Sequence, residues 1–112
     1  RLCPRDTRAP HAIQTVVRDS VRRGAGMIET TYREAIRQAL TDAMQAAPDV
    51  VLIGEEVGLY GGAYGVNRGL IDLFGAERVI DAPISEAAIV GAAIGAAMTG
   101  LRPVAELMYV DF

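Results

Sequence analysis

Carboxylate side chains follow three segments that the sequence predicts to be strands. Glu55 and Glu56 come directly after the first segment, Asp81 and Glu86 follow the second, and Asp111 follows the third. In an open α/β sheet the carboxyl ends of parallel strands share one edge, and ligands bind in the crevice outside that edge. Each acid taken alone also fits a solvated loop residue, but their shared position predicts a ligand site lined by acids.

Glu86 is the acid best placed for proton exchange with a ligand. It falls in the first turn of a predicted helix, directly after Ser85, which is a favourable residue for a helix N-cap. The helix dipole favours the ionised carboxylate, whereas burial and neighbouring carboxylates favour the protonated acid. Opposed influences of this kind can set a carboxyl group to share a proton with a neutral heterocycle.

The glycine-rich segment 58–65 raises the alternative of a phosphate-binding loop. It lacks the G-x-G-x-x-G spacing of a dinucleotide site and the Gly-Lys-Ser/Thr of a P-loop. Glu55 and Glu56 directly precede it and would repel a diphosphate. The sequence therefore disfavours an unrelated nucleotide-binding α/β domain, which would bind a dinucleotide without a partner.

Composition excludes several other classes of protein. A hydrophobic content of 51% excludes a disordered chain, and the longest stretch of small apolar residues, 87–98, is too short to span a bilayer. Cys3 is the only cysteine, which excludes a disulfide framework and suits a reducing compartment. His11 is the only histidine, which excludes a Ser-His-Asp triad and a multi-histidine metal site.

The elements that must position the acids can be predicted from caps, breakers and hydrophobic period. Strands alternating with helices predict an α/β domain with a parallel sheet and helices on both faces. The expected elements are a helix from the Thr31–Glu34 capping box to Pro48, a strand at 50–53 ending at Gly54, and a helix from about Val66 to Phe74 closed by Gly75. They continue with a strand at 78–81, a helix that Ser85 caps and that runs to about Thr99 before Gly100, and a strand at 104–110.

Charge divides the chain near Met27. Residues 1–26 hold six arginines and two acids, whereas residues 27–112 hold five arginines and twelve acids. We expect residues 1–26 to be a disordered, arginine-rich N-terminal extension, with a transit peptide or a nucleic-acid-binding arm as alternatives. We expect residues 27–112 to be a domain that is cut off at Phe112.

The ordered part of the chain closely resembles the beta subunits of thiamine-diphosphate-dependent 2-oxoacid dehydrogenases, meaning the pyruvate and branched-chain enzymes and the related acetoin dehydrogenase. The resemblance covers residues 27–112 and implies the start of the pyrimidine-binding domain of the transketolase-like fold. The residues that carry it, in chain order, are Ile53-Gly-Glu-Glu-Val57, Tyr60-Gly-Gly-Ala-Tyr64, Gly69-Leu70, Phe74-Gly75, Arg78-Val-Ile-Asp81, Pro83-Ile-Ser-Glu86, Gly95-Ala-Ala-Met98 and Gly100-Leu-Arg-Pro103.

The resemblance implies a catalytic role for Glu86. In the family, this glutamate hydrogen-bonds a ring nitrogen of the aminopyrimidine of thiamine diphosphate and favours the imino tautomer, which removes the proton from the thiazolium carbon. Ile84, Met108 and Phe112 match positions that line or stack on the aminopyrimidine, and Glu55 matches a nearby position of the proton network. For Met108 and Phe112, plain core packing is the alternative.

The resemblance also implies partners. The diphosphate and its magnesium would be held by an alpha subunit, because residues 1–112 contain no G-D-G…N magnesium motif and no metal ligand is expected among them. The resemblance further implies a heterotetramer with a second beta subunit, and acyl transfer to a lipoyl-bearing acyltransferase component. We expect this assembly in a bacterial cytoplasm rather than in a mitochondrial matrix. We expect the fragment alone to be inactive, with no nucleic-acid or membrane partner.

Two features stand beside this interpretation. The family usually has D-T-P-I-S-E where this chain has Ala82 in place of the threonine, which removes a possible hydrogen bond beside the catalytic turn. Small residues recur on one face of the helix that follows Glu86, which favours close packing within the chain or against a partner. A non-catalytic module that keeps only subunit-interaction surfaces is therefore the alternative function. The substrate, whether pyruvate, a branched-chain 2-oxoacid or acetoin, does not follow from these residues.

Overall fold

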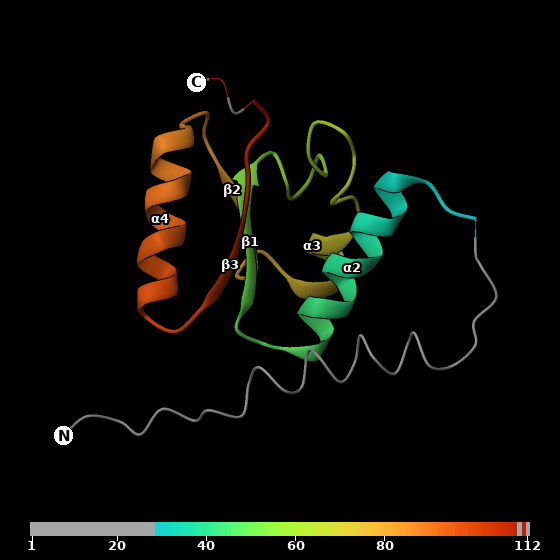
Figure 1. Cartoon of the computed structure of the whole chain (residues 1–112), viewed down its shortest axis with the longest axis horizontal. Coiled ribbons are helices and arrows are strands. Elements are labelled where there is room, and N and C mark those ends of the chain that lie inside the picture. Colours follow the sequence, from blue (N-terminus) through green and yellow to red (C-terminus); the bar gives the residue numbers. More distant parts are fainter. Residues whose placement is uncertain (1–28, 110, 112) are drawn as a thin grey trace. The chain divides into compact units, whose positions relative to one another are not determined.

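Residues 29–109 and 111 are described by the computed structural model of the chain, and their three strands form one parallel sheet in the order β2-β1-β3 (Figure 1). From Thr31 onward they belong to one compact unit. The elements are α2 (Tyr32–Ala46), β1 (Val50–Glu55), α3 (Leu70–Phe74), β2 (Val79–Ala82), α4 (Glu86–Met98) and β3 (Arg102–Glu106). The predicted α/β class with a parallel sheet is confirmed, and the extension expected over residues 1–26 lies outside the described residues.

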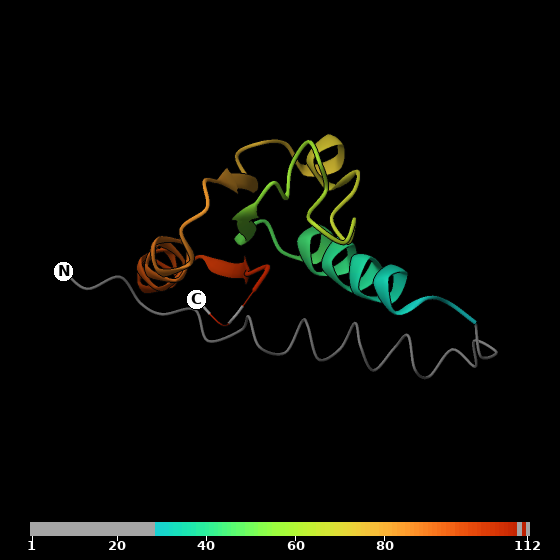
Figure 2. The same cartoon turned by 90° about the horizontal axis from the view of Figure 1, so that it is seen from above.

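Helices cover both faces of the sheet, as the alternation of elements predicts. In Figures 1 and 2, α4 lies on one side of the strands and α2 and α3 lie on the other. The main core fills the space between the sheet and α2 and α3, and β1, which is apolar from Val50 to Ile53, contributes two of its residues. This core consists of Met44, Ala47, Val50, Leu52, Val57, Leu70 and Val79.

The first helix begins at the predicted capping box. Thr31 Oγ1 accepts a hydrogen bond from the Glu34 backbone N–H at 3.2 Å, and the Glu34 carboxylate accepts from the Thr31 backbone N–H and hydroxyl at 3.4 and 2.8 Å. These bonds to the Thr31 side chain and backbone lower the pKa of Glu34, since they favour the charged carboxylate. The helix ends at Ala46, two residues before Pro48.

Strand boundaries differ from the prediction by one to four residues. β1 continues through Gly54 to Glu55, and β2 is shifted by one residue to Val79–Ala82. β3 runs from Arg102 to Glu106 instead of 104–110, so Pro103 lies inside the strand. The strand tolerates this proline because β3 is an edge strand: Arg102 N–H donates to Asp49 O, so the next residue's missing N–H falls on the open side.

One helix start and one helix cap differ from the prediction. The helix expected from Val66 begins at Leu70, because Gly69 has a left-handed φ of 85° that a helix cannot continue through. Ser85 occupies the N-cap position of α4, but its hydroxyl donates to Pro83 O at 3.0 Å and makes no cap bond. No helix in the described part of the chain is long and apolar enough to cross a membrane.

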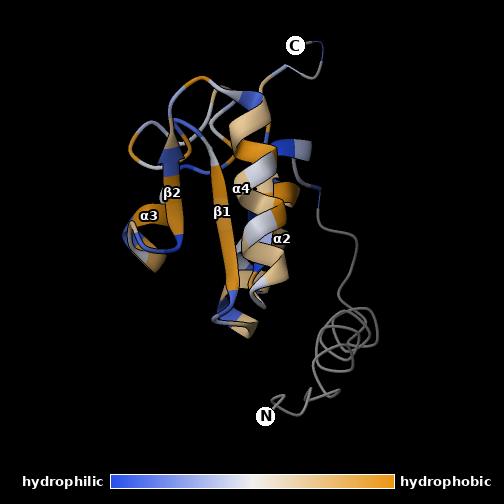
Figure 3. Ribbon diagram, turned by 90° about the vertical axis from the view of Figure 1, so that its left-hand side faces the viewer, coloured by the Kyte–Doolittle hydropathy of each residue, from blue (hydrophilic) through white to orange (hydrophobic). Residues whose placement is uncertain are grey.

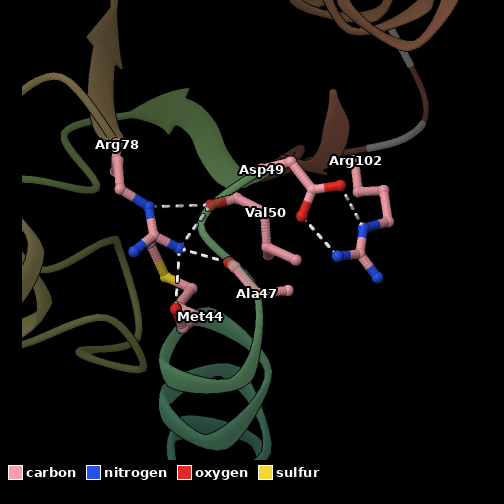
Figure 4. Close-up of polar contacts among 6 residues, drawn as sticks. All are labelled: Met44, Ala47, Asp49, Val50, Arg78 and Arg102. Atoms are coloured by element: carbon pink, nitrogen blue, oxygen red, sulfur yellow. Dashed lines mark hydrogen bonds and ion pairs between the residues drawn. The ribbon is translucent and has the colours of Figure 1, made fainter. Parts of the chain in front are cut away.

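Arg78 connects α2, β1 and β2 at the amino-terminal ends of the two strands (Figure 4). Its guanidinium donates to the carbonyl oxygens of Met44, Ala47 and Val50 at 2.8 Å each, and it lies 5.1 Å from the centre of the Phe74 ring. These carbonyls end a helix and begin a strand, so they lack partners in regular structure. One side chain therefore fixes the connection between the first helix and the central strand.

Candidate functional site

The acids at the carboxyl ends of the strands lie on two different faces of the sheet. In the parallel register Gly54 is level with Asp81 on β2 and with Glu106 on β3, whereas Glu55 is level with Ala82. Because side chains alternate along a strand, Asp81 and Glu106 face the side of the main core and Glu55 faces the side of α4. The sequence predicted Glu55 and Asp81 at one edge, and only the register shows that they face opposite sides of the sheet.

On the α2–α3 side, the acids anchor the segment 56–69, here called the glycine loop. Asp81 Oδ1 accepts a hydrogen bond from the Gly58 backbone N–H at 2.7 Å. The Glu106 carboxylate accepts from Asn67 Nδ2, and Asn67 is fully buried. Asp81 and Glu106 therefore hold the loop against the ends of β2 and β3.

Close backbone contact explains two glycines in this region. A Cβ on Gly54 would lie 2.9 Å from the Cβ and backbone oxygen of Glu106, and a Cβ on Gly61 would lie 2.7 Å from Arg68 Cα. Both distances are shorter than real Cβ contacts, so any side chain would push the loop or β3 away. Gly61 also has a φ of 86°, which favours glycine.

Sequence reasoning missed the anchors of the glycine loop. Arg37 on α2 donates to the backbone oxygens of Gly65 and Val66 at 2.8 and 3.0 Å. Asn67 and Glu106 are joined across a separation of 39 residues. The single available signal was local: asparagine and glycine mark turns, but nothing in the spacing predicts which distant residue receives the amide.

On the α4 side, Glu55 is a buried carboxylate with no partner in the described structure. Its exposed fraction is 3%, and neither carboxylate oxygen has a hydrogen bond. A buried polar group without a partner is costly, so such groups are rare outside functional sites and unfilled binding sites. Glu55 is thus positioned to accept hydrogen bonds from a ligand or a partner.

Glu86 lines a cavity of about 440 Å³ on this side of the sheet. It is the first residue of α4 and is half-buried. The helix runs antiparallel to the strands, so this end of α4 lies at the carboxyl edge of the sheet (Figure 1). The other lining residues are mostly apolar: Ala87, Val90, Gly91, Ile94, Leu107 and Tyr109.

The other predicted site residues take different places. Ile84 is 79% exposed in the turn before α4. Met108 is half-buried, and its two neighbours Leu107 and Tyr109 line the cavity of Glu86 while Met108 does not. Phe112 lies outside the described residues. Ile84 and Met108 therefore flank the cavity in the chain without lining it.

Metal-ligating side chains do not gather among residues 29–109 and 111: no group of three or more His, Cys, Asp or Glu is placed to hold an ion there. Asp111, expected at the edge after the third strand, is exposed. On the α4 side, the polar groups near the carboxyl ends of the strands are thus the buried Glu55 carboxylate and the Glu86 carboxylate, of which Glu86 lines the cavity.

Comparison with known proteins defines the class. The profile of the family described as "Transketolase, pyrimidine binding domain" matches residues 29–112, which is most of the chain. The chain belongs to this family. The α/β fold with its parallel sheet agrees with that assignment, and the resemblance drawn from the sequence motifs is confirmed.

The relatives are beta subunits of one kind of dehydrogenase. The chain is 55% identical over 84 residues to "Pyruvate dehydrogenase E1 component subunit beta-2, mitochondrial" of Oryza sativa subsp. japonica, covering 75% of this chain and 22% of the relative. It is 51% identical over 89 residues to the corresponding subunit beta of Rhizobium meliloti (strain 1021), covering 80% and 19%. A rat mitochondrial subunit beta is 41% identical, covering 90% and 32%. The chain thus spans between about a fifth and a third of the length of these relatives.

Proposed function

We propose that this chain supplies the pyrimidine-binding side of a thiamine diphosphate site in the beta subunit of a 2-oxoacid dehydrogenase of the pyruvate type. The observation that carries the proposal is the pair of acids on the α4 side of the sheet. Glu55 is buried without a hydrogen-bond partner, and Glu86 begins α4 at the same edge beside an apolar cavity. The pyruvate dehydrogenase subunits among the relatives favour this class over an acetoin dehydrogenase.

The residues present fit an aminopyrimidine ring. Such a ring has nitrogen atoms that need a hydrogen-bonding acid and faces that need apolar contact. Glu86 supplies the acid at the cavity, Val90 and Leu107 supply apolar lining, and the two unpartnered oxygens of Glu55 supply acceptors nearby. When bound, thiamine diphosphate supplies the carbanion chemistry that a 2-oxoacid needs for loss of carbon dioxide.

The chain's own residues bind, orient and move a proton. Glu86 holds a proton against a ring nitrogen and thereby selects the tautomer of the ring. Glu55, which is level with Ala82, faces the α4 side of the sheet, where Glu86 also lies. It forms the next acid of the proton network. Ile84, Met108 and Phe112 contact the ring faces. For Ile84, 79% exposed in this chain, that role requires the remaining parts of the site to cover it.

Several parts of the proposed enzyme lie outside these residues. An alpha subunit would bind the diphosphate and its magnesium, a second beta subunit would complete a heterotetramer, and a lipoyl-bearing acyltransferase component would receive the acyl group. The chain alone is then inactive. The relatives include mitochondrial and bacterial proteins, and we retain the bacterial cytoplasm as the proposed compartment.

The variant Glu86→Gln tests the catalytic role. In the beta subunit co-produced with its alpha subunit, we expect the exchange of the thiazolium proton to slow by at least about a hundredfold, the scale of general acid–base catalysis. Subunit assembly should be unchanged, because glutamine has nearly the same shape. Exchange is followed by NMR after mixing the holoenzyme with deuterated water and quenching in acid.

Glu77→Gln is the matched control, because Glu77 is exposed in the turn before β2 and makes the same change of charge. Proton exchange at the wild-type rate in the Glu86 variant would overturn the assignment. A holoenzyme that assembles but shows no decarboxylation even with wild-type Glu86 would favour the non-catalytic module. The exposed apolar side chains of α4, Ile94 and Met98 among them, are the observation that keeps this second function open.

A further inference from the structure

Two arginines, Arg33 and Arg68, line one pocket beside the glycine loop. Five arginines occur between residues 29 and 111, and three of them have carbonyl or carboxylate partners: Arg37, Arg78 and Arg102. Arg33 and Arg68 make no hydrogen bond or ion pair with any described residue. Both line the same pocket, although they lie 35 positions apart in the sequence.

The pocket has a volume of about 350 Å³ and is rich in hydrogen-bond donors. Tyr60 and Tyr64 line it with the two arginines, and both tyrosine side chains are about two-thirds exposed. Guanidinium groups match the oxygens of phosphate in a bidentate geometry, and phenol hydroxyls add further donors. Because arginine has no acceptor, this set of groups selects an anion with several oxygens.

The loop that forms the pocket floor is already fixed. Gly62 N–H donates to Glu56 O at 2.8 Å, Gly65 N–H donates to Gly62 O at 3.0 Å, and Arg37 holds Gly65 O from α2. A ligand would therefore not have to order the loop, which reduces the entropic cost of binding. The guanidinium of Arg37 also adds positive charge beside the pocket.

Acids near the pocket offset part of this charge, since the Thr31 hydrogen bonds and the charges of Arg33 and Arg37 together lower the pKa of Glu34. The Glu34 carboxylate is hydrogen-bonded to Thr31, and the Glu106 carboxylate behind Gly62 accepts from Asn67. Glu55, which in the sequence argued against phosphate, faces the other side of the sheet. Glu56 remains as an exposed carboxylate in water. The residues after Met27 are acidic as a group, yet Arg33, Arg37 and Arg68 gather at this one loop.

We propose that the pocket formed by Arg33, Tyr60, Tyr64 and Arg68 binds a phosphate group, either free or carried on a small molecule. It shares no residue with the cavity of Glu86. The volume exceeds what one phosphate fills, and the two tyrosine rings provide contact area for the molecule that carries it. The proposal does not depend on the proposed function, so the Glu86 experiment stands whatever its outcome.

The test is a titration followed by ¹H–¹⁵N NMR of the 112-residue chain at pH 7, with ionic strength held constant by sodium chloride. Inorganic phosphate should shift the backbone amides of residues 60–65 in a saturable manner, with a dissociation constant of about 1–10 mM for a partly exposed site. Phenyl phosphate distinguishes the sources: tighter binding than inorganic phosphate indicates a phosphate carried on a small molecule, and equal binding indicates the free anion.

Arginine variants give the decisive comparison. Arg33→Gln and Arg68→Gln should each weaken phosphate binding at least about fivefold, a loss of about 1 kcal/mol, and the double variant should abolish saturation. Arg33→Lys and Arg68→Lys keep the charge and should bind with intermediate affinity. Arg23→Gln, with the same change of charge elsewhere in the chain, should bind as the wild type does. Shifts that do not saturate, or that persist in the double glutamine variant, would overturn the proposal.

Discussion

The acidic side chains of this protein differ in their burial and in their hydrogen-bond partners. Glu34 and Asp49 have hydrogen-bond partners that stabilise their charged forms, so the pKa of each is lowered. Glu55 is buried with no partner, and Glu86 borders an apolar cavity. The same residue type therefore serves as a helix cap in one place and as a candidate proton carrier in another. Residue type alone does not separate these roles, because burial and partners come from distant segments.

Asp49 gives a pH-dependent prediction at this scale. Its hydrogen bond with Arg102 lowers its pKa below the usual value near 3.8, so the ion pair stabilises the fold above that value and is lost as pH falls through the lowered pKa. Both side chains are about one-third exposed, so solvent limits the contribution to about 0.5–1 kcal/mol. Asp49→Asn should therefore be less stable than wild type at pH 7 and equal to it near pH 2.

Urea unfolding followed by circular dichroism at pH 7, 4 and 2 measures this difference. Asp42→Asn on the exposed side of α2 is the control for loss of a negative charge, although it also alters a contact with Gln38. The same gap between Asp49→Asn and wild type at all three pH values would contradict the electrostatic origin.

At the scale of elements, caps and breakers determined the first helix and misplaced others. The helix α2 begins at the Thr31 capping box because its two reciprocal bonds involve residues three apart, which sequence spacing shows directly. The start of α3 depends on Gly69 and on Asn67, whose N–H donates to Gly61 O across the loop. The start of β3 depends on pairing with β1, which carries Pro103 into the strand. Contacts of this range are not visible in local patterns.

Thr31→Ala tests the cap. Loss of the hydroxyl removes the acceptor for the Glu34 N–H, and we expect the free energy of unfolding to fall by about 1 kcal/mol. Thr30→Ala removes a hydroxyl one position earlier, before the helix begins, and should change stability by less than about 0.5 kcal/mol. Urea midpoints of the two variants provide the measurement. Equal effects would mean that the box adds nothing to the stability of α2.

At the scale of the whole molecule, the two faces of the sheet are packed to different degrees. The α2–α3 side holds the main core. Arg78 covers this core at the amino-terminal ends of the strands, and the glycine loop covers it at their carboxyl ends. On the other side, α4 consists of apolar residues and glycine after Glu86, as the colours of Figure 3 show. Val90 and Ile94 are exposed there. Both side chains also line the cavity of Glu86, and under the proposed function they meet other parts of the enzyme.

Arg78→Lys tests how much one side chain contributes to the stability of the α2–α3 side. Lysine cannot reach the carbonyls of Met44, Ala47 and Val50 with the planar fork of arginine, and the unpaired carbonyls should lower the free energy of unfolding by about 1–3 kcal/mol. Arg102→Lys is the matched control and should lose less than about 1 kcal/mol, since its partner Asp49 is at the surface. Similar losses in chemical denaturation of both variants would show that Arg78 is not the special link.

The sequence by itself determined the class of fold, the first helix, the buried central strand and the motifs that identify the family. These features depend on local spacing: a period, a cap, a breaker or an ordered series of short motifs. The prediction that Glu86 is catalytic also came from sequence and stays a proposal, as do the roles of Glu55, Ile84, Met108 and Phe112.

Only the tertiary structure decided which acids work together. Strand register separated Glu55 from Asp81 and Glu106, because adjacent residues of a strand face opposite sides of the sheet. Folding also brought Arg33 of the first helix and Arg68 of the glycine loop to one pocket, although two glutamates directly precede that loop in the sequence. Electrostatics depends on distance in space, and distance along the chain predicts it only where the contact is local.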